Sequence, residues 1–359
     1  MHDGQPAALR VHGGVHRAEL RALALQPEQV LDFSVNVNAY GPAPSVLRAI
    51  AGAPIDRYPD PRAERACDAL GASLGEPRER VLLGHGAAEL LWSAARSLLA
   101  PGSSALIVEP TFCELRAAAL ACGARVLEWR ARAEHGFAID LIAVRAAAER
   151  AGARAIYLCA PNTPTGTAVP AAEIAAVAAS LPEVSWIVDQ SFLSLSERFA
   201  DAAVAQPSNV LRVCSLTKDH AIPGLRVGYA IGNPALLQRM EAERFAWCTS
   251  APAQAAAEAA ATAGSFVAQS RSRLLADAAH LAAALRALGL HPLPSSTAFM
   301  LVELPAAIGT AAALRARLLE RQRVLVRDCA SFGLPRHMRI AARPAADCAR
   351  LIAALEEEL

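Results

Sequence analysis

Residues 215–229 read SLTKDHAIPGLRVGY, and this stretch contains the single lysine of the chain, Lys218. The other 34 of the 35 Lys and Arg side chains in this 359-residue chain are arginine. A guanidinium stays protonated in almost any protein environment, whereas burial or a nearby charge can make an ammonium neutral and nucleophilic. Only lysine can form a Schiff base with an aldehyde. The lone lysine therefore favours amine chemistry at position 218, and its competitor is chance survival in an arginine-rich chain.

The segments around this stretch predict buried strands joined by helices. Short apolar runs occur at 81–83, 105–108, 155–159, 185–189, 209–215 and 226–232. Alanine-rich helical patterns follow the first three of these runs, at 87–99, 112–123 and 170–181. Continuous apolar strands interleaved with helices indicate an α/β fold with a mainly parallel sheet that is covered on both faces.

The pattern changes after about residue 245. Helical patterns at 252–263 and 266–289 precede apolar runs at 298–304, 323–328 and 338–343, and a helix is expected over 344–358. Fewer strands indicate a smaller α+β domain. We predict an N-terminal arm and small-domain segment over 1–40, a large cofactor-binding domain over 41–245 and a small C-terminal domain over 246–359.

Composition excludes several classes of protein. Hydrophobic residues make up 54% of the chain and charged residues 19%, which suits a large core and argues against disorder. A net charge of +1 with dispersed arginines gives no footprint for nucleic acid or an anionic membrane. No segment approaches the roughly 20 apolar residues of a membrane span, and the first residues lack a signal-peptide core. Eight scattered cysteines without a CxxC pair indicate reduced thiols, no metal site and a cytoplasmic location.

Polar residues follow the predicted strands, where a doubly wound sheet binds its ligands. The glycine-rich turn GHGAAE (84–89) opens a helix and can bind an anion, although such turns are also common without a ligand. Asp189 ends a buried strand, and a buried carboxylate needs a partner. Ser215, Lys218 and Arg226 follow the next strand.

These residues supply an amine, a carboxylate and a phosphate cradle. Pyridoxal 5′-phosphate needs all three: its aldehyde reacts with a lysine, a carboxylate keeps its ring nitrogen protonated, and its phosphate dianion binds arginine and backbone amides. We therefore predict pyridoxal 5′-phosphate as the cofactor.

At these positions the chain resembles the fold-type I pyridoxal-phosphate enzymes of the class I/II aminotransferase superfamily, whose lysine segment reads S-x-T-K followed by PGLR-x-GY. Further similar segments are, in order, DFSVNVNAYGP (32–42), YPDP (58–61), GHGAAEL (84–90), EPTF (109–112), PNTPTG (161–166), VDQSF (188–192) and VRDCASFGLPRHMRIAAR (326–343). The most similar branch comprises histidinol-phosphate aminotransferase and threonine-phosphate decarboxylase. The resemblance implies a large domain with a mainly parallel sheet and a smaller α+β C-terminal domain.

The resemblance also implies residue roles. Lys218 is expected to form the Schiff base, and Asp189 to face the ring nitrogen. The expected contacts to the cofactor are Gly86, Ala87, Ala88, Phe112, Asn162, Thr163, Ser215, Arg226 and, from the other subunit, Tyr58. The expected contacts to the substrate are His12, Asn38, Arg327 and Arg339. The role of Tyr58 implies a homodimer with shared sites.

The chain departs from the superfamily pattern in several places. Thr163 stands where an asparagine usually donates to the 3′-oxygen of the cofactor, and Asn162 precedes it, so this contact is open. Phe192 stands where aminotransferases often have a tyrosine, and Ala39 replaces the usual proline after Asn38.

Motifs that hold the cofactor do not select the reaction, because orientation of the substrate decides which bond breaks. Three features favour decarboxylation: HGG (12–14), Phe192 and VRDCASFGLP (326–335). We predict decarboxylation of L-threonine O-3-phosphate to (R)-1-aminopropan-2-yl phosphate in cobalamin biosynthesis, with Arg327 on the substrate phosphate and Arg339 on the carboxylate. The alternatives are an aminotransferase of the histidinol-phosphate type, acting on a phosphorylated amino acid or amine, and a non-catalytic binder of the cofactor. A carboxylate-binding arginine favours turnover over mere binding.

Overall fold

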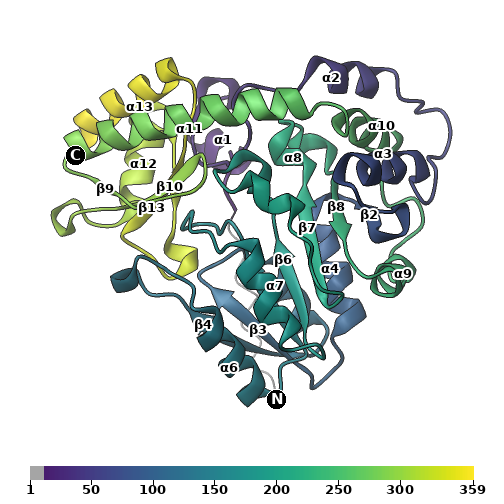
Figure 1. Cartoon of the computed structure of the whole chain (residues 1–359). Coiled ribbons are helices and arrows are strands. Elements are labelled where there is room, and N and C mark those ends of the chain that lie inside the picture. Colours follow the sequence, from purple (N-terminus) through teal and green to yellow (C-terminus); the bar gives the residue numbers. More distant parts are fainter. Residues whose placement is uncertain (1–11) are drawn as a thin grey trace.

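A seven-stranded sheet lies at the centre of the larger part of the computed structural model, which describes residues 12–359 (Figure 1). Its strands are β2 (Val81–Gly84), β3 (Ser104–Glu109), β4 (Arg125–Arg130), β5 (Ala155–Cys159), β6 (Ser185–Asp189), β7 (Val210–Ser215) and β8 (Gly228–Ile231). They lie in the order β2-β8-β7-β6-β5-β3-β4, and only β8 runs antiparallel to its neighbours. The predicted α/β class is confirmed. The edge strand β4 was not predicted because its residues are only partly buried and do not form a continuous apolar run.

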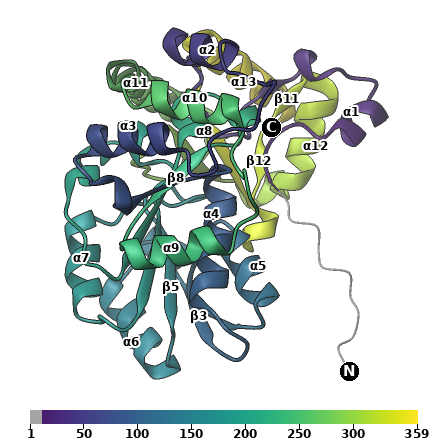
Figure 2. The same cartoon turned by 90° about the vertical axis from the view of Figure 1, so that its right-hand side faces the viewer.

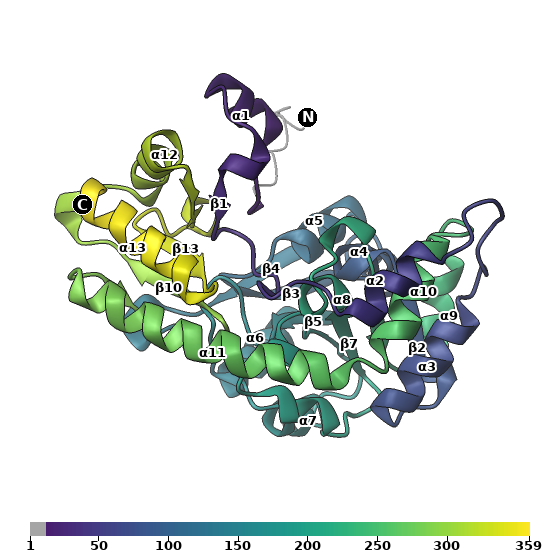
Figure 3. The same cartoon turned by 90° about the horizontal axis from the view of Figure 1, so that it is seen from above.

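Helices cover both faces of this sheet. They are α2 (Pro44–Ala51), α3 (Glu64–Leu74), α4 (Gly86–Leu98), α5 (Glu114–Ala121), α6 (Leu141–Ala151), α7 (Ala171–Ala179), α8 (Leu216–Asp219), α9 (Pro234–Ala242) and α10 (Ala251–Ala260). Side chains alternate across a strand, so Ile107 of β3 packs with α4 and α5 while its neighbour Leu106 packs with α6 and α7. Figure 3 shows α4 and α5 on one side of the strands and α6 and α7 on the other.

The C-terminal part contains a four-stranded antiparallel sheet. Its strands, in order, are β12 (Arg327–Asp328), β13 (His337–Ala341), β10 (Phe299–Glu303) and β9 (His291–Pro292). The helices of this part are α11 (Gly264–Ala287), α12 (Ala311–Gln322) and α13 (Ala345–Glu358). The single strand predicted over 323–328 is divided between two sheets. Its first half, β11 (Val324–Leu325), pairs in parallel with β1 (Leu31–Asp32), whereas β12 joins β13.

The N-terminal segment packs against the C-terminal part. Leu20 of α1 (Arg17–Ala22) contacts the cluster of Leu319 and Leu325, and Figure 2 shows α1 beside α12. Residues 1–11 of the predicted arm lie outside the described residues. Ala253 of α10, which we assigned to the small domain, packs in the same cluster as Val46 of α2. This packing suggests that the large core extends beyond residue 245, and the domain division itself stays a prediction.

Short 3₁₀ helices connect the main elements. Those in the described residues are η1 (Pro27–Gln29), η2 (Arg78–Arg80), η3 (Ala133–His135), η4 (Leu193–Leu195), η5 (Phe199–Ala203), η6 (Pro223–Leu225), η7 (Ala306–Ile308) and η8 (Ala330–Phe332). Between residues 12 and 359, no helix combines the length and hydrophobicity that a membrane span requires. The cytoplasmic location stays a prediction.

Candidate active site

One cavity of about 390 Å³, called the main cavity below, brings together most of the predicted site residues. Eleven of them line it: His12, Ala87, Ala88, Phe112, Thr163, Asp189, Ser215, Lys218, Arg226, Arg327 and Arg339. Gly86, Asn38, Asn162 and Tyr58 do not belong to its lining. The cavity wall draws on the C-terminal ends of β6 and β7, the start of α4, the arm near His12 and the strands β12 and β13.

Lys218 lies in the short helix α8, directly after β7. Its backbone carbonyl accepts a hydrogen bond from the Asn38 backbone at 2.9 Å, and the Asn38 side chain donates to the carbonyl of Asp219 at 3.0 Å. Burial lowers the pKa of Lys218 to about 8, and repulsion from Arg226 and Arg339 adds to this effect. The amine is therefore much closer to its neutral, nucleophilic form than an exposed lysine.

Asp189 ends β6 and is buried. Its carboxylate accepts one hydrogen bond from the Tyr157 hydroxyl at 3.2 Å and another from the Ser191 backbone N–H at 2.9 Å. Burial raises the pKa of Asp189, while the hydrogen bonds from Ser191 and Tyr157 and the charge of Lys218 oppose that shift. A carboxylate held in this way can serve as the partner of a cationic group in the cavity.

The first turn of α4 and Arg226 form a site for an anion. Gly86 adopts φ +80°, and a Cβ at this position would lie 2.9 Å from Arg226 Nη2. A Cβ at Gly228 would lie 3.0 Å from the backbone nitrogen of Ala87. The two glycines therefore keep the guanidinium and the helix N-terminus close together. The N–H groups of a first helical turn have no partners within the helix, and with Arg226 they suit a phosphate.

Arg327 and Arg339 form a second cationic centre from neighbouring strands, because they are paired residues of β12 and β13. Arg339 is buried and donates to Thr163 Oγ1 at 2.7 Å and to the Ser34 carbonyl at 2.5 Å. Within residues 12–359 its Nε has no hydrogen-bond partner. Burial and the nearby Arg327 lower the pKa of Arg339 to about 10, so it remains charged at neutral pH. Two buried guanidinium groups at one site favour an anionic ligand.

Comparison with known proteins identifies the family of this chain. The family model of class I and II aminotransferases matches residues 28–355. The chain belongs to this family. Histidinol-phosphate aminotransferase 2 of Ralstonia nicotianae is 35% identical over 347 residues, which cover 94% of this chain and 91% of the relative.

Solved structures agree with this assignment. Histidinol-phosphate aminotransferase of Sinorhizobium meliloti in complex with pyridoxal 5′-phosphate matches with a TM-score of 0.86 and 26% identity, covering 96% of this chain and 94% of the other. L-threonine-O-3-phosphate decarboxylase of Porphyromonas gingivalis matches with a TM-score of 0.79 and 26% identity, covering 91% and 99%. The fold-type I assignment and the predicted cofactor are confirmed.

The main function predicted from the sequence, decarboxylation of threonine phosphate, is wrong. Besides the Ralstonia protein, further relatives at 30–34% identity are named histidinol-phosphate aminotransferases. They support an aminotransferase rather than a lyase, and they give no support for a role in cobalamin biosynthesis. The motifs that hold the cofactor are common to both reactions, and HGG, Phe192 and VRDCASFGLP did not discriminate between them.

Two of the predicted ligands, Asn162 and Asn38, make hydrogen bonds within the fold. The Asn162 amide accepts from Thr111 Oγ1 at 3.0 Å and donates to Thr165 Oγ1 and the Pro110 carbonyl, both at 2.9 Å. The amide is thereby engaged with its own loop and with the segment after β3, whereas Thr163 lines the cavity and accepts from Arg339. Asn38 is buried behind Lys218 and holds its turn. Contacts of Asn162 and Thr163 with the cofactor, and of Asn38 with the substrate, stay predictions without support from these hydrogen bonds.

Tyr58 lies on the surface and is 77% exposed. It stacks on Trp247 with ring centroids 4.4 Å apart, and the nearby chain also exposes Phe245. A side chain in this position is available to a second subunit. Its contact with the partner's cofactor and the homodimer stay predictions.

Sequence reasoning missed two groups that touch the site. Tyr157 lies in the apolar run of β5, and its contact with Asp189 depends on the pairing of β5 with β6. Glu114 is buried in the lining of the main cavity, within 3.2 Å of His12 Nε2. In the sequence Glu114 is an ordinary first-turn helix residue, so no local pattern could have identified it.

Proposed function

We propose that the protein is a pyridoxal-phosphate-dependent aminotransferase of the histidinol-phosphate type that acts on a phosphorylated amino acid or amine. The observation that carries this proposal is the presence of two separate cationic centres around one amine. Arg226 and the first turn of α4 form one centre, and Arg327 and Arg339 form the other. One centre suits the phosphate of the cofactor, which leaves the second for the anionic group of a substrate.

The residues of the chain fit the cofactor. When bound, pyridoxal 5′-phosphate supplies an aldehyde for the lysine and an electron sink that weakens bonds at the amino-bearing carbon of the substrate. Ser215, Arg226 and the N–H groups of Ala87 and Ala88, which line the main cavity, would hold its phosphate dianion. The Asp189 carboxylate, oriented by Tyr157, would keep the ring nitrogen of the bound cofactor protonated.

Lys218 acts as the base that moves the substrate proton. Its pKa of about 8 suits this role, since general bases work best with a pKa near the working pH. Burial is the main cause of that value, and repulsion from Arg226 and Arg339 adds to it.

Arg339 recognises the anionic group of the substrate. Thr163 and the Ser34 carbonyl fix its guanidinium, and its Nε remains available within the described residues. Arg327 is also buried, and it donates to the Asp328 carbonyl at 2.7 Å and to Ser331 Oγ at 2.6 Å. Rigid planar donors bind carboxylate and phosphate oxygens selectively.

The test measures amino transfer with matched donors. The holoenzyme is incubated with 2-oxoglutarate and either histidinol phosphate or threonine O-3-phosphate, each beside its unphosphorylated counterpart, and glutamate is quantified. We expect glutamate from at least one phosphorylated donor, with a kcat/KM at least tenfold above that of its counterpart. The proposal is wrong if no phosphorylated donor yields glutamate or if the phosphate makes no difference.

A further inference from the structure

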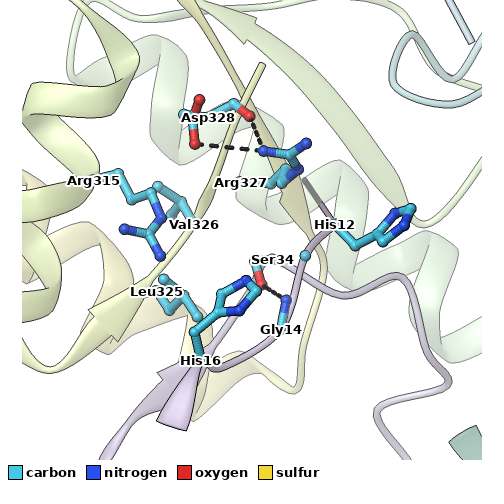
Figure 4. Close-up of a pocket in the computed structure, with 10 residues that line it drawn as sticks. His12, Gly14, His16, Ser34, Arg315, Leu325, Val326, Arg327 and Asp328 are labelled. Carbon is cyan, nitrogen blue, oxygen red and sulfur yellow. Dashed lines mark hydrogen bonds and ion pairs between the residues drawn. The ribbon is translucent and has the colours of Figure 1, made fainter. Parts of the chain in front are cut away.

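The two glycines of HGG (12–14) dock the N-terminal arm on Ser34. A Cβ at Gly13 would lie 2.3 Å from the Ser34 carbonyl oxygen and 3.4 Å from Arg339 Nη2. Gly14 adopts φ +101°, and its N–H donates to Ser34 Oγ at 2.7 Å (Figure 4). Ser34 therefore binds both the arm and the substrate-binding arginine, because its Oγ accepts from Gly14 and its carbonyl accepts from Arg339.

This docking brings His12 to a buried carboxylate of the large domain. His12 Nε2 lies 3.2 Å from Glu114 Oε1, and Trp92 Nε1 donates to Glu114 Oε2 at 2.7 Å. The Glu114 side chain is only 7% exposed, whereas that of His12 is 43% exposed. The hydrogen bond from Trp92 orients the Glu114 carboxylate, and the imidazole of His12 lies between this carboxylate and the ring of Phe112, whose centroid is 5.6 Å away.

The imidazole lies where two cavities meet. A second cavity of about 220 Å³, the arm cavity, shares His12, Gly13, Ser34 and Arg327 with the main cavity (Figure 4). Figure 4 shows the His12 ring turned away from His16 and Arg315, which line the far side of the arm cavity. The charge of Arg315 is compensated by Glu19 through two hydrogen bonds of 2.6 and 2.8 Å.

We propose that Glu114 is a positioning residue that acts through His12 to set the affinity for the phosphate group of the substrate. In an imidazolium both ring nitrogens donate, so Nε2–H serves Glu114 while Nδ1–H serves a phosphate oxygen. The Glu114 carboxylate fixes the direction in which the ring faces. This inference rests on the proposed function and names the residues that recognise the second anion beside Arg327.

The same side chains could instead surround a metal ion, because the ligand atoms of His12, Cys113 and Glu114 lie within 4.8 Å of one another. One observation favours the pairing of His12 with Glu114 over a metal site. Both carboxylate oxygens of Glu114 already have partners, since Oε2 accepts from Trp92 Nε1 and Oε1 lies 3.2 Å from His12 Nε2.

A double-mutant cycle tests whether Glu114 acts through His12. KM and kcat are measured for His12→Ala, Glu114→Ala and the double variant, with a phosphorylated donor and its unphosphorylated counterpart. We expect each single variant to raise KM for the phosphorylated donor about tenfold more than for the counterpart. The double variant should be no worse than either single variant, since both remove the same interaction.

His16→Ala is the matched control, because His16 lies on the same arm and faces only the arm cavity. We expect it to leave both KM values unchanged. Trp92→Phe keeps the carboxylate but removes its second donor, and we expect a selective increase of about two- to threefold. This variant also carries the test if Glu114→Ala does not fold.

Several results would overturn the inference. Multiplicative losses in the double variant would show that the two residues act independently. An effect of His16→Ala equal to that of His12→Ala would assign the role to the whole arm, and a loss of phosphate selectivity after dialysis against a chelator would make the residues metal ligands. A wild-type enzyme that does not distinguish the two donors would contradict the proposed function itself, before any variant is compared.

Discussion

Replacement of Arg339 by methionine tests the substrate-binding centre most directly. Methionine keeps much of the side-chain length but removes the guanidinium, which donates to Thr163 Oγ1 and Ser34 and has an Nε without a partner among the described residues. A charge-assisted hydrogen bond contributes about 1.5–3 kcal/mol. At about 1.4 kcal/mol per decade, one lost bond to an anionic substrate raises KM roughly 10- to 150-fold.

Arg339→Met should leave the free energy of unfolding of the cofactor-free protein almost unchanged. The lowered pKa of Arg339 means that burial disfavours its charge, so its loss removes an unfavourable contribution while Thr163 and Ser34 lose a donor. We expect the free energy of unfolding to change by no more than about 1 kcal/mol. Denaturant unfolding measures this quantity, and steady-state kinetics with several amino donors measures KM.

Two further variants show whether the change in KM comes from the guanidinium of Arg339. Thr163→Val removes one acceptor of Arg339 and should raise KM about fivefold, corresponding to about 1 kcal/mol. Arg336→Met is the matched control, because Arg336 is an exposed neighbour that pairs with Glu303 at 2.6 Å, and KM should not change. An unchanged KM in Arg339→Met, or a loss of several kcal/mol in stability, would refute the reasoning and make Arg339 a structural residue.

Three further predictions concern the amine, a buried acid and the dimer. Borohydride reduction of the holoenzyme should label only the peptide that contains Lys218, as found by peptide mapping, and a label confined to another peptide would contradict the assignment. Burial raises the pKa of Asp219 to about 7, so this group favours the folded state below its unfolded pKa near 4 and loses that contribution as the pH rises through 7. Asp219→Asn should therefore be more stable than the wild type at pH 8, by at most on the order of 4 kcal/mol, with little gain near pH 4. Denaturant unfolding at both pH values checks the sign of this difference. An equal gain at both pH values would rule out titration of Asp219 as the cause. Tyr58→Phe should weaken cofactor binding about three- to tenfold without changing a dimeric sedimentation coefficient, because only the hydroxyl is removed; unchanged cofactor affinity would leave the tyrosine with a surface role only.

Much of the fold and part of the site could be read from local sequence. The apolar runs that became β5 and β6 agree with the structure to the residue, because continuous burial leaves a strong local pattern. The half-exposed strand β4 and the division of 323–328 between two sheets were missed, since neither depends on local hydrophobicity alone. The main reaction was also misread, because the motifs describe how a cofactor is held and not which bond is oriented for cleavage.

By itself the sequence determined the α/β class, the cofactor and the residues Lys218, Asp189 and Arg226 as candidates, because residue type, spacing and strand ends are properties of contiguous segments. Only the tertiary structure decided that Thr163 rather than Asn162 contacts Arg339, that Asn38 supports the lysine turn, and that Glu114 meets His12. The hydrogen bonds of Arg339 and Asn38 join residues 176 and 181 positions apart. The contact of His12 with Glu114 brings the arm onto the start of α5. These long-range contacts depend on strand register, on the close approach that Gly13 permits and on which side of a loop a side chain faces. The spacing of residues along one segment specifies none of these three.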